Sequence, residues 1–402
     1  MTEIQIIQDY ENSRLIDTGV YDENYIYIFH ELVDSSHDNS TSYEALKYDY
    51  VNKECISLLP FEKPVHGLHR SQGKKHIYYS NLEWNKNEAI INIYQIDCEV
   101  MRSKKVYTLS IVDMFAKSEE YSSICRYELF GIDERYLLFG KPELNPSTKL
   151  NSSGFSEYIL IDILDQKSYS VPEMIGRHDS ILHLSYLSVF ECLDQREIII
   201  ETGRIAPWEK KQLWTQKKAN MSEGEKNQSV VVMPLDIFID NIKKGEPIQE
   251  SYIIQKIYED SALIQLVIQG SNLKIYKGNF LDDNSEIITY SLIKQQKTEC
   301  VLVNSIYYKL FFDENEIFGL KKLDDSDELY CLKSDKLIYS SRSCTDIYWA
   351  SQKYLITRQY LEKEDLISLK LIDLNTEKTI HEMIGNNPNF SYIPSADILL
   401  FS

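Results

Sequence analysis

The residues best suited to chemistry are histidines and arginines gathered in two short segments. Five of the eight histidines lie there, with His66, His69, Arg70 and His76 in the first segment and Arg177, His178 and His183 in the second. Histidine carries protons near neutral pH, and arginine pairs with carboxylates or phosphates as a planar fork. The candidate catalytic residues are therefore His66, His69, Arg177 and His178, and Arg70 is a candidate ligand-binding residue. The alternative is that these are hydrogen-bonded histidines on surface loops.

Glutamates close several short apolar runs. Glu31 lies in NYIYIFHEL, Glu83 ends KHIYYSNLE and Glu143 ends RYLLFGKPE. Gathered carboxylates can ligate a cation or act as acid and base, so these three are candidate ligand-binding residues. In a chain with 62 acidic residues, solvated strand ends are the alternative explanation. No metal site is predicted from them.

The segment at residues 205–228, IAPWEKKQLWTQKKANMSEGEKNQ, is the longest insertion. Together with Arg204 it holds six basic and three acidic residues, and it carries Trp208 and Trp214. Long loops in compact domains are usually functional or disordered. We expect either an arm that docks a partner through the two tryptophans or a solvated excursion.

Aspartates recur at one place in a repeated pattern: Asp49, Asp97, Asp162, Asp236 and Asp373. Each stands just before a polar turn, where a carboxylate accepts backbone N–H groups and stabilises a hairpin. We therefore expect structural aspartates here, and not a metal or catalytic ring.

Sequence motifs that would identify an enzyme are lacking. The chain has no G-x-S-x-G elbow, no phosphate-binding glycine loop and no His-Glu-x-x-His. The sequence thus leaves the cofactor unknown and names no nucleophile.

The elements that must position these residues are β-strands, because the apolar periodicity is two almost throughout. Only residues 112–121 and 235–243 have patterns that suit short helices. A repeated unit contains an apolar strand ending in an acid, a second strand ending in aspartate, a polar turn and a further strand. Hairpin-forming strands precede several units, which predicts four antiparallel strands in each.

Seven such units fit the chain at about 57 residues each, which is typical of propeller blades. In this pattern the chain resembles β-propeller repeat proteins, without the Trp-Asp signature of WD40 blades or the double glycine of kelch blades. We predict an all-β propeller of about seven four-stranded antiparallel blades, with six or eight as alternatives. Two sandwich or barrel domains divided near 205–228 are the other alternative.

The two ends of the chain also carry strand patterns. TEIQIIQ at 2–8 resembles an orphan strand, and NFSYIPSADILLF at 389–401 resembles two strands of a blade. We predict that residues 1–402 form a single propeller domain whose ring is closed by both ends. The segment 205–228 would then interrupt the fourth blade between its second and third strands.

The resemblance also implies where the candidate residues would meet. In propellers, the loops after the second and fourth strands of each blade open on the face with the channel mouth, the usual ligand site. The glutamates and the two histidine–arginine segments would converge on that face.

Composition restricts the partners. The chain has 402 residues, 43 basic and 62 acidic, for a net charge of −19. A strongly acidic surface repels phosphate backbones, so nucleic acid is not expected. No apolar run is long enough to span a membrane, and no signal peptide is found. Seven scattered cysteines predict reduced thiols in a cytoplasm.

Two functions remain open. The first is a cytoplasmic binding or scaffold propeller that recognises a protein or small-molecule ligand at the channel face. The second is a hydrolase, lyase or isomerase that acts on a small molecule at the channel mouth. Fold does not choose between them, since propellers host both. We favour binding, because no catalytic constellation can be demonstrated.

Overall fold

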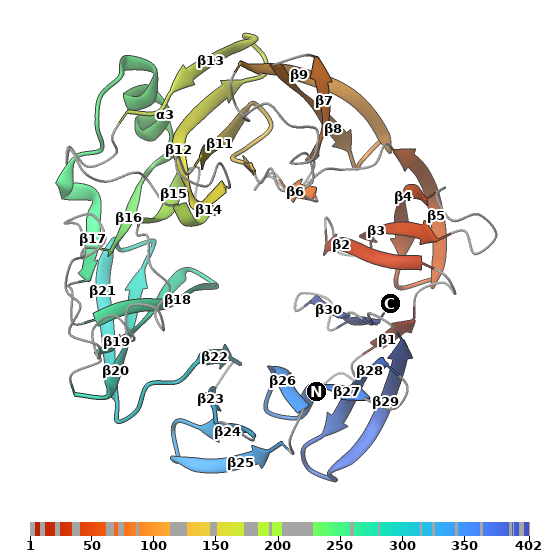
Figure 1. Ribbon diagram of the computed structural model, residues 1–402. Helices are drawn as coiled ribbons and strands as arrows, with labels where there is room; N and C mark the ends of the chain where they lie inside the picture. The colour runs from red at the N-terminus through yellow and green to blue at the C-terminus, as the bar shows by residue number, and fades with distance from the viewer. Residues whose placement is uncertain are drawn as a thin grey trace. The chain divides into compact units, whose positions relative to one another are not determined.

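The computed structural model describes residues 5–8, 13–20, 25–33, 41–61, 68–70, 76–85, 88–112, 127–144, 151–172, 184–192, 195–202, 228–257, 261–279, 282–313, 316–323, 326–341, 345–361, 365–385, 388, 390–393 and 398–401. These residues form seven four-stranded sheets, each built from four consecutive strands (Figure 1). The predicted fold class, an all-β propeller with about seven four-stranded antiparallel blades, is confirmed.

The first four sheets are meanders. The first contains β2 (Ser13–Val20), β3 (Tyr25–Val33), β4 (Thr41–Asp49) and β5 (Glu54–Phe61). The second contains β6 (Leu68–Arg70), β7 (His76–Asn85), β8 (Glu88–Asp97) and β9 (Arg102–Val112). The third contains β10 (Glu128–Gly131), β11 (Tyr136–Leu144), β12 (Asn151–Asp162) and β13 (Lys167–Ser170). The fourth contains β14 (Leu184–Cys192), β15 (Gln195–Thr202), β16 (Gln228–Pro234) and β17 (Ile253–Ile257).

The last three four-stranded sheets repeat the arrangement. The fifth contains β18 (Ser261–Gln269), β19 (Asn272–Asn279), β20 (Asn284–Ser291) and β21 (Gln296–Val303). The sixth contains β22 (Lys309–Phe312), β23 (Ile317–Lys322), β24 (Asp327–Cys331) and β25 (Lys336–Ser340). The seventh contains β26 (Thr345–Ala350), β27 (Tyr354–Leu361), β28 (Leu366–Asp373) and β29 (Lys378–Gly385).

An additional three-stranded sheet joins the two ends of the chain. Its order is β1 (Gln5–Gln8), β31 (Ile398–Phe401) and β30 (Phe390–Ile393). The chain divides into two compact units, the first holding the four N-terminal sheets and most of this terminal sheet, the second the other three sheets. That residues 1–402 form one domain with a closed ring stays a prediction.

One hairpin turn recurs between the third and fourth strands. The residue four positions after the last residue of the third strand has a positive φ in six sheets, namely Lys53, Met101, Gln166, Gln295, Asp335 and Glu377. Side chains other than glycine adopt this left-handed region at some cost. The repeated turn explains how a chain with only 14 glycines makes so many hairpins.

The aspartates predicted to stabilise these turns do so at four positions. Asp49 Oδ1 accepts the N–H groups of Val51 and Asn52, both at 2.9 Å, and the bonds from Asn52 lower the pKa of Asp49. Asp97, Asp162 and Asp373 accept backbone N–H groups in the same way. In the fifth sheet, the Ser291 hydroxyl accepts the N–H of Lys294 instead, at 3.2 Å.

The fifth predicted turn aspartate, Asp236, is a correction. It lies in the first turn of helix α3 (Leu235–Lys244), which stands between β16 and β17 where the other sheets have a hairpin. Leu235, Phe238, Ile239 and Ile242 form the buried face at helical spacing. The left-handed Gly245 ends the helix and donates to the carbonyls of Asn241 and Ile242.

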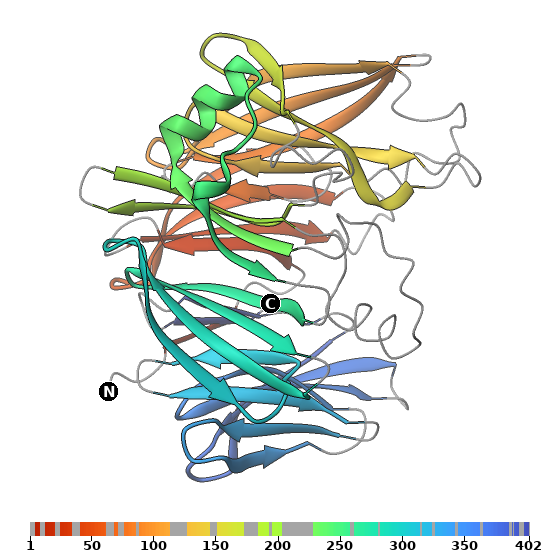
Figure 2. The ribbon, with the colours of Figure 1, turned by 90° about the vertical axis from the view of Figure 1, so that its left-hand side faces the viewer.

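Helix α3 lies beside the third and fourth sheets (Figure 2). Its apolar face joins one cluster with Leu138 and Leu160 of the third sheet and Ile198 and Val231 of the fourth. The helix predicted at 235–243 is thus confirmed, whereas most of 112–121 is outside the described residues. Within the described ranges, no helix is long and apolar enough to cross a membrane.

Candidate functional site

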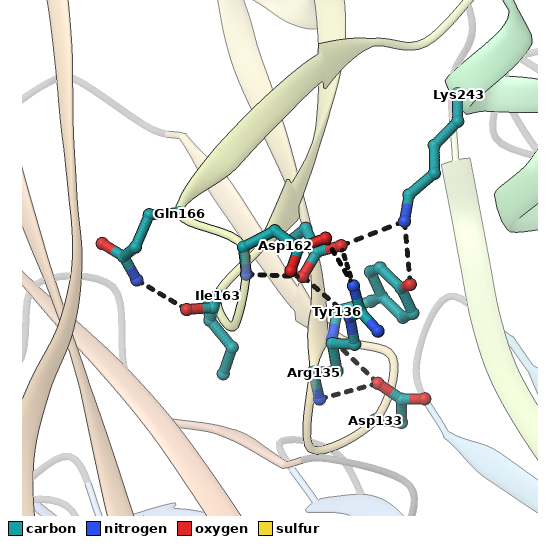
Figure 3. A network of polar contacts seen from close by, with 8 residues as sticks. Asp133, Arg135, Tyr136, Asp162, Ile163, Gln166 and Lys243 are labelled. Atoms are coloured by element: carbon teal, nitrogen blue, oxygen red, sulfur yellow. Dashed lines mark hydrogen bonds and ion pairs between the residues drawn. The ribbon is translucent and has the colours of Figure 1, made fainter.

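Among the described residues of the first unit, a group of charges surrounds Asp162, at the end of β12. Its side chain has no exposed surface. Arg135 donates two hydrogen bonds to it, Nε to Oδ1 at 2.8 Å and Nη2 to Oδ2 at 2.7 Å, which is the bidentate geometry of a strong pair. Lys243 of helix α3 donates a third bond from Nζ to Oδ2, at 3.0 Å (Figure 3).

The pKa values follow from these contacts. Burial by itself disfavours the ionised form of Asp162, but the hydrogen bonds from Arg135 and Lys243 outweigh it and hold the pKa well below its ordinary value. Burial also opposes the charge on Lys243, yet its bonds to Tyr136 and Asp162 raise its pKa. Asp162, Lys243 and Arg135 are therefore all charged at neutral pH.

Local structure positions Arg135 before it pairs. Asp133 Oδ1 accepts the N–H groups of Arg135 and Tyr136, both at 2.8 Å, which stabilises the turn between β10 and β11. The other carboxylate oxygen of Asp133 accepts a bond at 2.8 Å from Arg196, the residue that follows the corresponding turn of the fourth sheet. One aspartate thus orders a turn in the third sheet and contacts the next sheet.

Tyr136 completes the cluster on β11, directly opposite Asp162 in the strand register. Its hydroxyl accepts a bond from Lys243 at 2.9 Å, and its ring lies 4.8 Å from the same ammonium. The same register position pairs Tyr25 with Asp49, His76 with Asp97 and Tyr354 with Asp373. The position is therefore a feature of the repeat. In the third sheet, Arg135 and the Lys243 side chain of helix α3 are added to it.

These contacts define what the Asp162 cluster can do. Asp162 is inaccessible, its oxygens accept bonds from two cations and a backbone N–H, and Arg135 also pairs with Asp165 at 2.7 Å. We conclude that the cluster holds helix α3 against the third sheet. Sequence reasoning missed this cluster and predicted a turn role for Asp162 alone, although Asp-x-Arg recurs at 133–135 and 194–196.

A different carboxyl group lies at the end of β15. Glu201 is opposite Tyr186 on β14 and Val230 on β16, and its side chain is partly buried. Burial raises the pKa of Glu201 to about 7. This acid therefore titrates near neutral pH, next to the point where the chain leaves the sheet for the segment 205–228.

The structure describes the side chain of one predicted site residue, Glu83. It is exposed on β7 and accepts a bond from Asn92 Nδ2 at 2.8 Å, so a neighbouring strand positions its carboxylate. His69 and Arg70 lie in β6, Glu31 lies in β3 and Glu143 lies in β11, but the structure describes only the backbone of these four residues. His66, Arg177, His178, Trp208 and Trp214 also lie outside the described residues. Their convergence stays a prediction.

Within the part of the chain that the structure describes, no group of three or more histidine, cysteine, aspartate or glutamate side chains could hold a metal ion.

Comparison with known proteins finds distant structural likenesses. No family model and no curated protein matches the chain. The β-propeller domain of the Trilobed protease from Pyrococcus furiosus is 12% identical, with a TM-score of 0.43, and the match covers 93% of this chain and 98% of that one. Sqt1 of Saccharomyces cerevisiae is 8% identical at TM-score 0.38, covering 92% and 99%. The Dos1 propeller is 8% identical at 0.35, covering 96% and 74%. The resemblance to β-propeller proteins is confirmed, and nothing about activity follows from such distant likenesses.

Proposed function

We propose that the protein is a non-catalytic β-propeller binding module that contacts a protein partner through the segment 205–228. The observation that supports this is how the segment is rooted. Thr202 on β15 and Ser229 on β16 are paired in the sheet register, so the chain leaves and re-enters the fourth sheet at adjacent positions. That residues 205–228 form a long basic insertion within this blade stays a prediction.

The root of the segment is firmly packed. Ile198, Ile199 and Ile200 on β15 have no exposed surface, and neither have Val230 and Val231 on β16. A packed hairpin is a rigid support from which an inserted segment can be presented. Binding residues commonly lie on loops that a rigid scaffold holds in place.

The composition of the segment suits a protein partner. Trp208 and Trp214 are half of the four tryptophans in the chain, and the segment is basic in a protein of net charge −19. Tryptophan and arginine are enriched among the residues that dominate binding energy at interfaces. We propose that the tryptophans anchor the partner and that the lysines favour acidic groups on it.

A cytoplasmic location is part of the proposal. Cys55, Cys300 and Cys331 are free thiols, as expected where thiols stay reduced. The alternative function, an enzyme using His66, His69, Arg177 and His178 with Arg70, Glu31, Glu83 and Glu143 around a small molecule, stays a prediction.

Replacing residues 203–227 with a short Asn-Gly turn tests the proposal. Thr202 and Ser229 remain neighbours, so the hairpin should close and the melting temperature should change little. Affinity capture, with mass spectrometry of the bound proteins, would compare this variant with the intact protein. We expect proteins reproducibly held by the intact chain to be lost.

A double variant, Trp208→Ala with Trp214→Ala, should also lose these proteins, whereas Thr215→Ala in the same segment should retain them. Undiminished capture by the variant lacking residues 203–227, in protein that melts normally, would refute the role of the segment.

A further inference from the structure

The second unit carries an exposed row of aromatic and charged side chains, which we call the Tyr308–Tyr348 surface. Its members are Tyr308 beside β22, Lys322 at the end of β23, Asp346 and Tyr348 on β26, and Arg358 on β27. Tyr308 is 42% exposed and Tyr348 is 38% exposed. Exposing aromatic rings to water is unfavourable, and exposed aromatic side chains gathered on one surface are typical of binding surfaces.

The members are linked by contact. Lys322 Nζ lies 5.0 Å from the centre of the Tyr308 ring and 3.2 Å from Asp346 Oδ1. Asp346 is opposite Arg358 in the strand register. Arg358 Nη1 donates to the Tyr348 hydroxyl at 2.6 Å, with the guanidinium carbon 5.5 Å from the ring centre.

Packing underneath orients the surface. Along β26, Ile347 and Ala350 are buried in a cluster with Leu320 and Leu329, while Asp346 and Tyr348 face outward. Strand side chains alternate between faces, so burial of Ile347 places Asp346 on the outer face, and the strand register shifts at Tyr348, which is also exposed. The N–H of Ile347 also donates to buried Asp327 at 2.9 Å, which holds β26 in place.

The cations of this surface keep donors available. The Lys322 ammonium has three N–H groups, and among described residues Asp346 accepts a hydrogen bond from one of them. The Arg358 guanidinium has five, and among described residues only Tyr348 accepts from it. Among the described residues, two cations here face one exposed anion, Asp346, because the other carboxylate near Lys322, that of Asp327, is buried.

We propose that the Tyr308–Tyr348 surface binds an acidic peptide segment of a partner protein, with carboxylates on Arg358 and Lys322 and apolar side chains against the two tyrosine rings. Arginine accepts carboxylates in a bidentate manner, and arginine and tyrosine are typical interface anchors. The net charge of −19 does not forbid this, because charges more than about 8 Å away are largely screened at physiological salt. The proposal does not depend on residues 205–228.

Fluorescence anisotropy with the full-length protein tests it. The probe is a labelled eight-residue peptide alternating glutamate and tyrosine. The comparison peptides alternate lysine with tyrosine, or glutamate with serine. We expect the glutamate–tyrosine peptide to bind at least tenfold more tightly than either, since only it offers both carboxylates and aromatic rings.

The double variant Lys322→Gln with Arg358→Gln should weaken this binding at least tenfold. Lys378→Gln, an exposed lysine on the outer strand β29 of the same sheet as Arg358, is the matched control and should change it less than twofold. Tyr348→Phe, which removes one hydroxyl, should weaken binding by a smaller factor and keeps the test valid if the double variant unfolds.

Equal binding of the acidic and basic peptides would overturn the proposal, as would an effect of Lys378→Gln as large as that of the double variant. The same variants can be tested on vesicles of anionic phospholipid. If the double variant lost affinity for the vesicles by the same factor as for the peptide, the proposal would also be overturned, because the surface would then recognise anionic membranes and not a peptide.

Discussion

The Asp162 cluster and the Tyr308–Tyr348 surface use the same chemical groups: arginine, lysine, aspartate and tyrosine. Around Asp162, a carboxylate with no exposed surface accepts bonds from Arg135, Lys243 and the backbone. On the Tyr308–Tyr348 surface, Asp346 is 54% exposed and the cations retain unused donors. The difference teaches that burial and hydrogen-bond saturation, more than residue type, separate a structural charge cluster from a binding surface in this protein.

The largest expected difference between the two regions comes from removing Asp162 and Asp346 separately. Asp162→Ala leaves Arg135 and Lys243 without their shared anion, and breaking a buried pair costs ~3–5 kcal/mol. Because 36% of Arg135 and 24% of Lys243 stay exposed, we expect about 3 kcal/mol. Urea unfolding would measure it, with Asp346→Ala as the exposed control, expected to change stability by at most ~1 kcal/mol.

The same pair of variants has a pH signature. The pKa of Asp162 is lower in the folded state than in the unfolded chain, so its contribution to stability is present above the ordinary value of 3.8 and is lost as pH falls below it. The stability gap between wild type and Asp162→Ala should stay constant from pH 8 to 5 and narrow below pH 4. A gap that does not change at low pH would mean that the ion pairs contribute little.

Glu201 sharpens the comparison, because it is a partly buried carboxyl whose pKa is raised and not lowered. Its folded-state pKa of about 7, against an ordinary 4.5, means that the folded state holds the proton more tightly. Its contribution to stability is therefore greatest below pH 4.5 and is lost as pH rises through 7. Glu201→Gln should increase stability at pH 8 by up to ~3 kcal/mol and change it little at pH 4.5.

Chemical denaturation at the two pH values measures this effect, and Glu191→Gln, an exposed residue of neighbouring β14, is the control. An equal gain at both pH values would contradict the assigned cause, because it would not depend on ionisation.

The smallest expected effect concerns the stability contribution of the exposed pair. Lys322→Gln removes a surface ion pair with Asp346, which is worth ~0.5 kcal/mol. A fall in the unfolding free energy above ~1.5 kcal/mol would show that this lysine has a structural role like that of Lys243. The contrast between the two regions would then fail.

Several features of the fold could be predicted from local sequence. Period-two alternation predicted the sheets, and Asp49, Asp97, Asp162 and Asp373 predicted their turns, because a carboxylate stabilises a hairpin through its own neighbours. The equivalent turn of the fifth sheet was missed because a serine, Ser291, replaces the aspartate there. Asp236 was assigned to a turn wrongly, since the apolar face of α3 has enough buried partners to favour a helix.

The candidate sites were less predictable. The histidine and arginine segments were chosen by residue type, and the side chains of their candidate site residues, His66, His69, Arg70, Arg177 and His178, lie outside the described ones. The pairing of Arg135 and Lys243 with Asp162 was not foreseen, and neither was that of Lys322 with Asp346. The partners come from different strands or sheets: Lys243 and Asp162 are 81 residues apart in the chain, and Lys322 and Asp346 are 24 apart. No local pattern reports such pairing.

The amino-acid sequence by itself determined the strands, their hairpins, the repeated four-stranded unit and the basic insertion after Thr202. These depend on interactions among residues close in the chain, namely alternation across a pleat and side chains that bond to the next turn. Only the tertiary structure decided which charges are buried and saturated and which stay exposed with donors to spare. That outcome depends on which sheets pack together, because burial removes water from a charge and makes its remaining partners decisive.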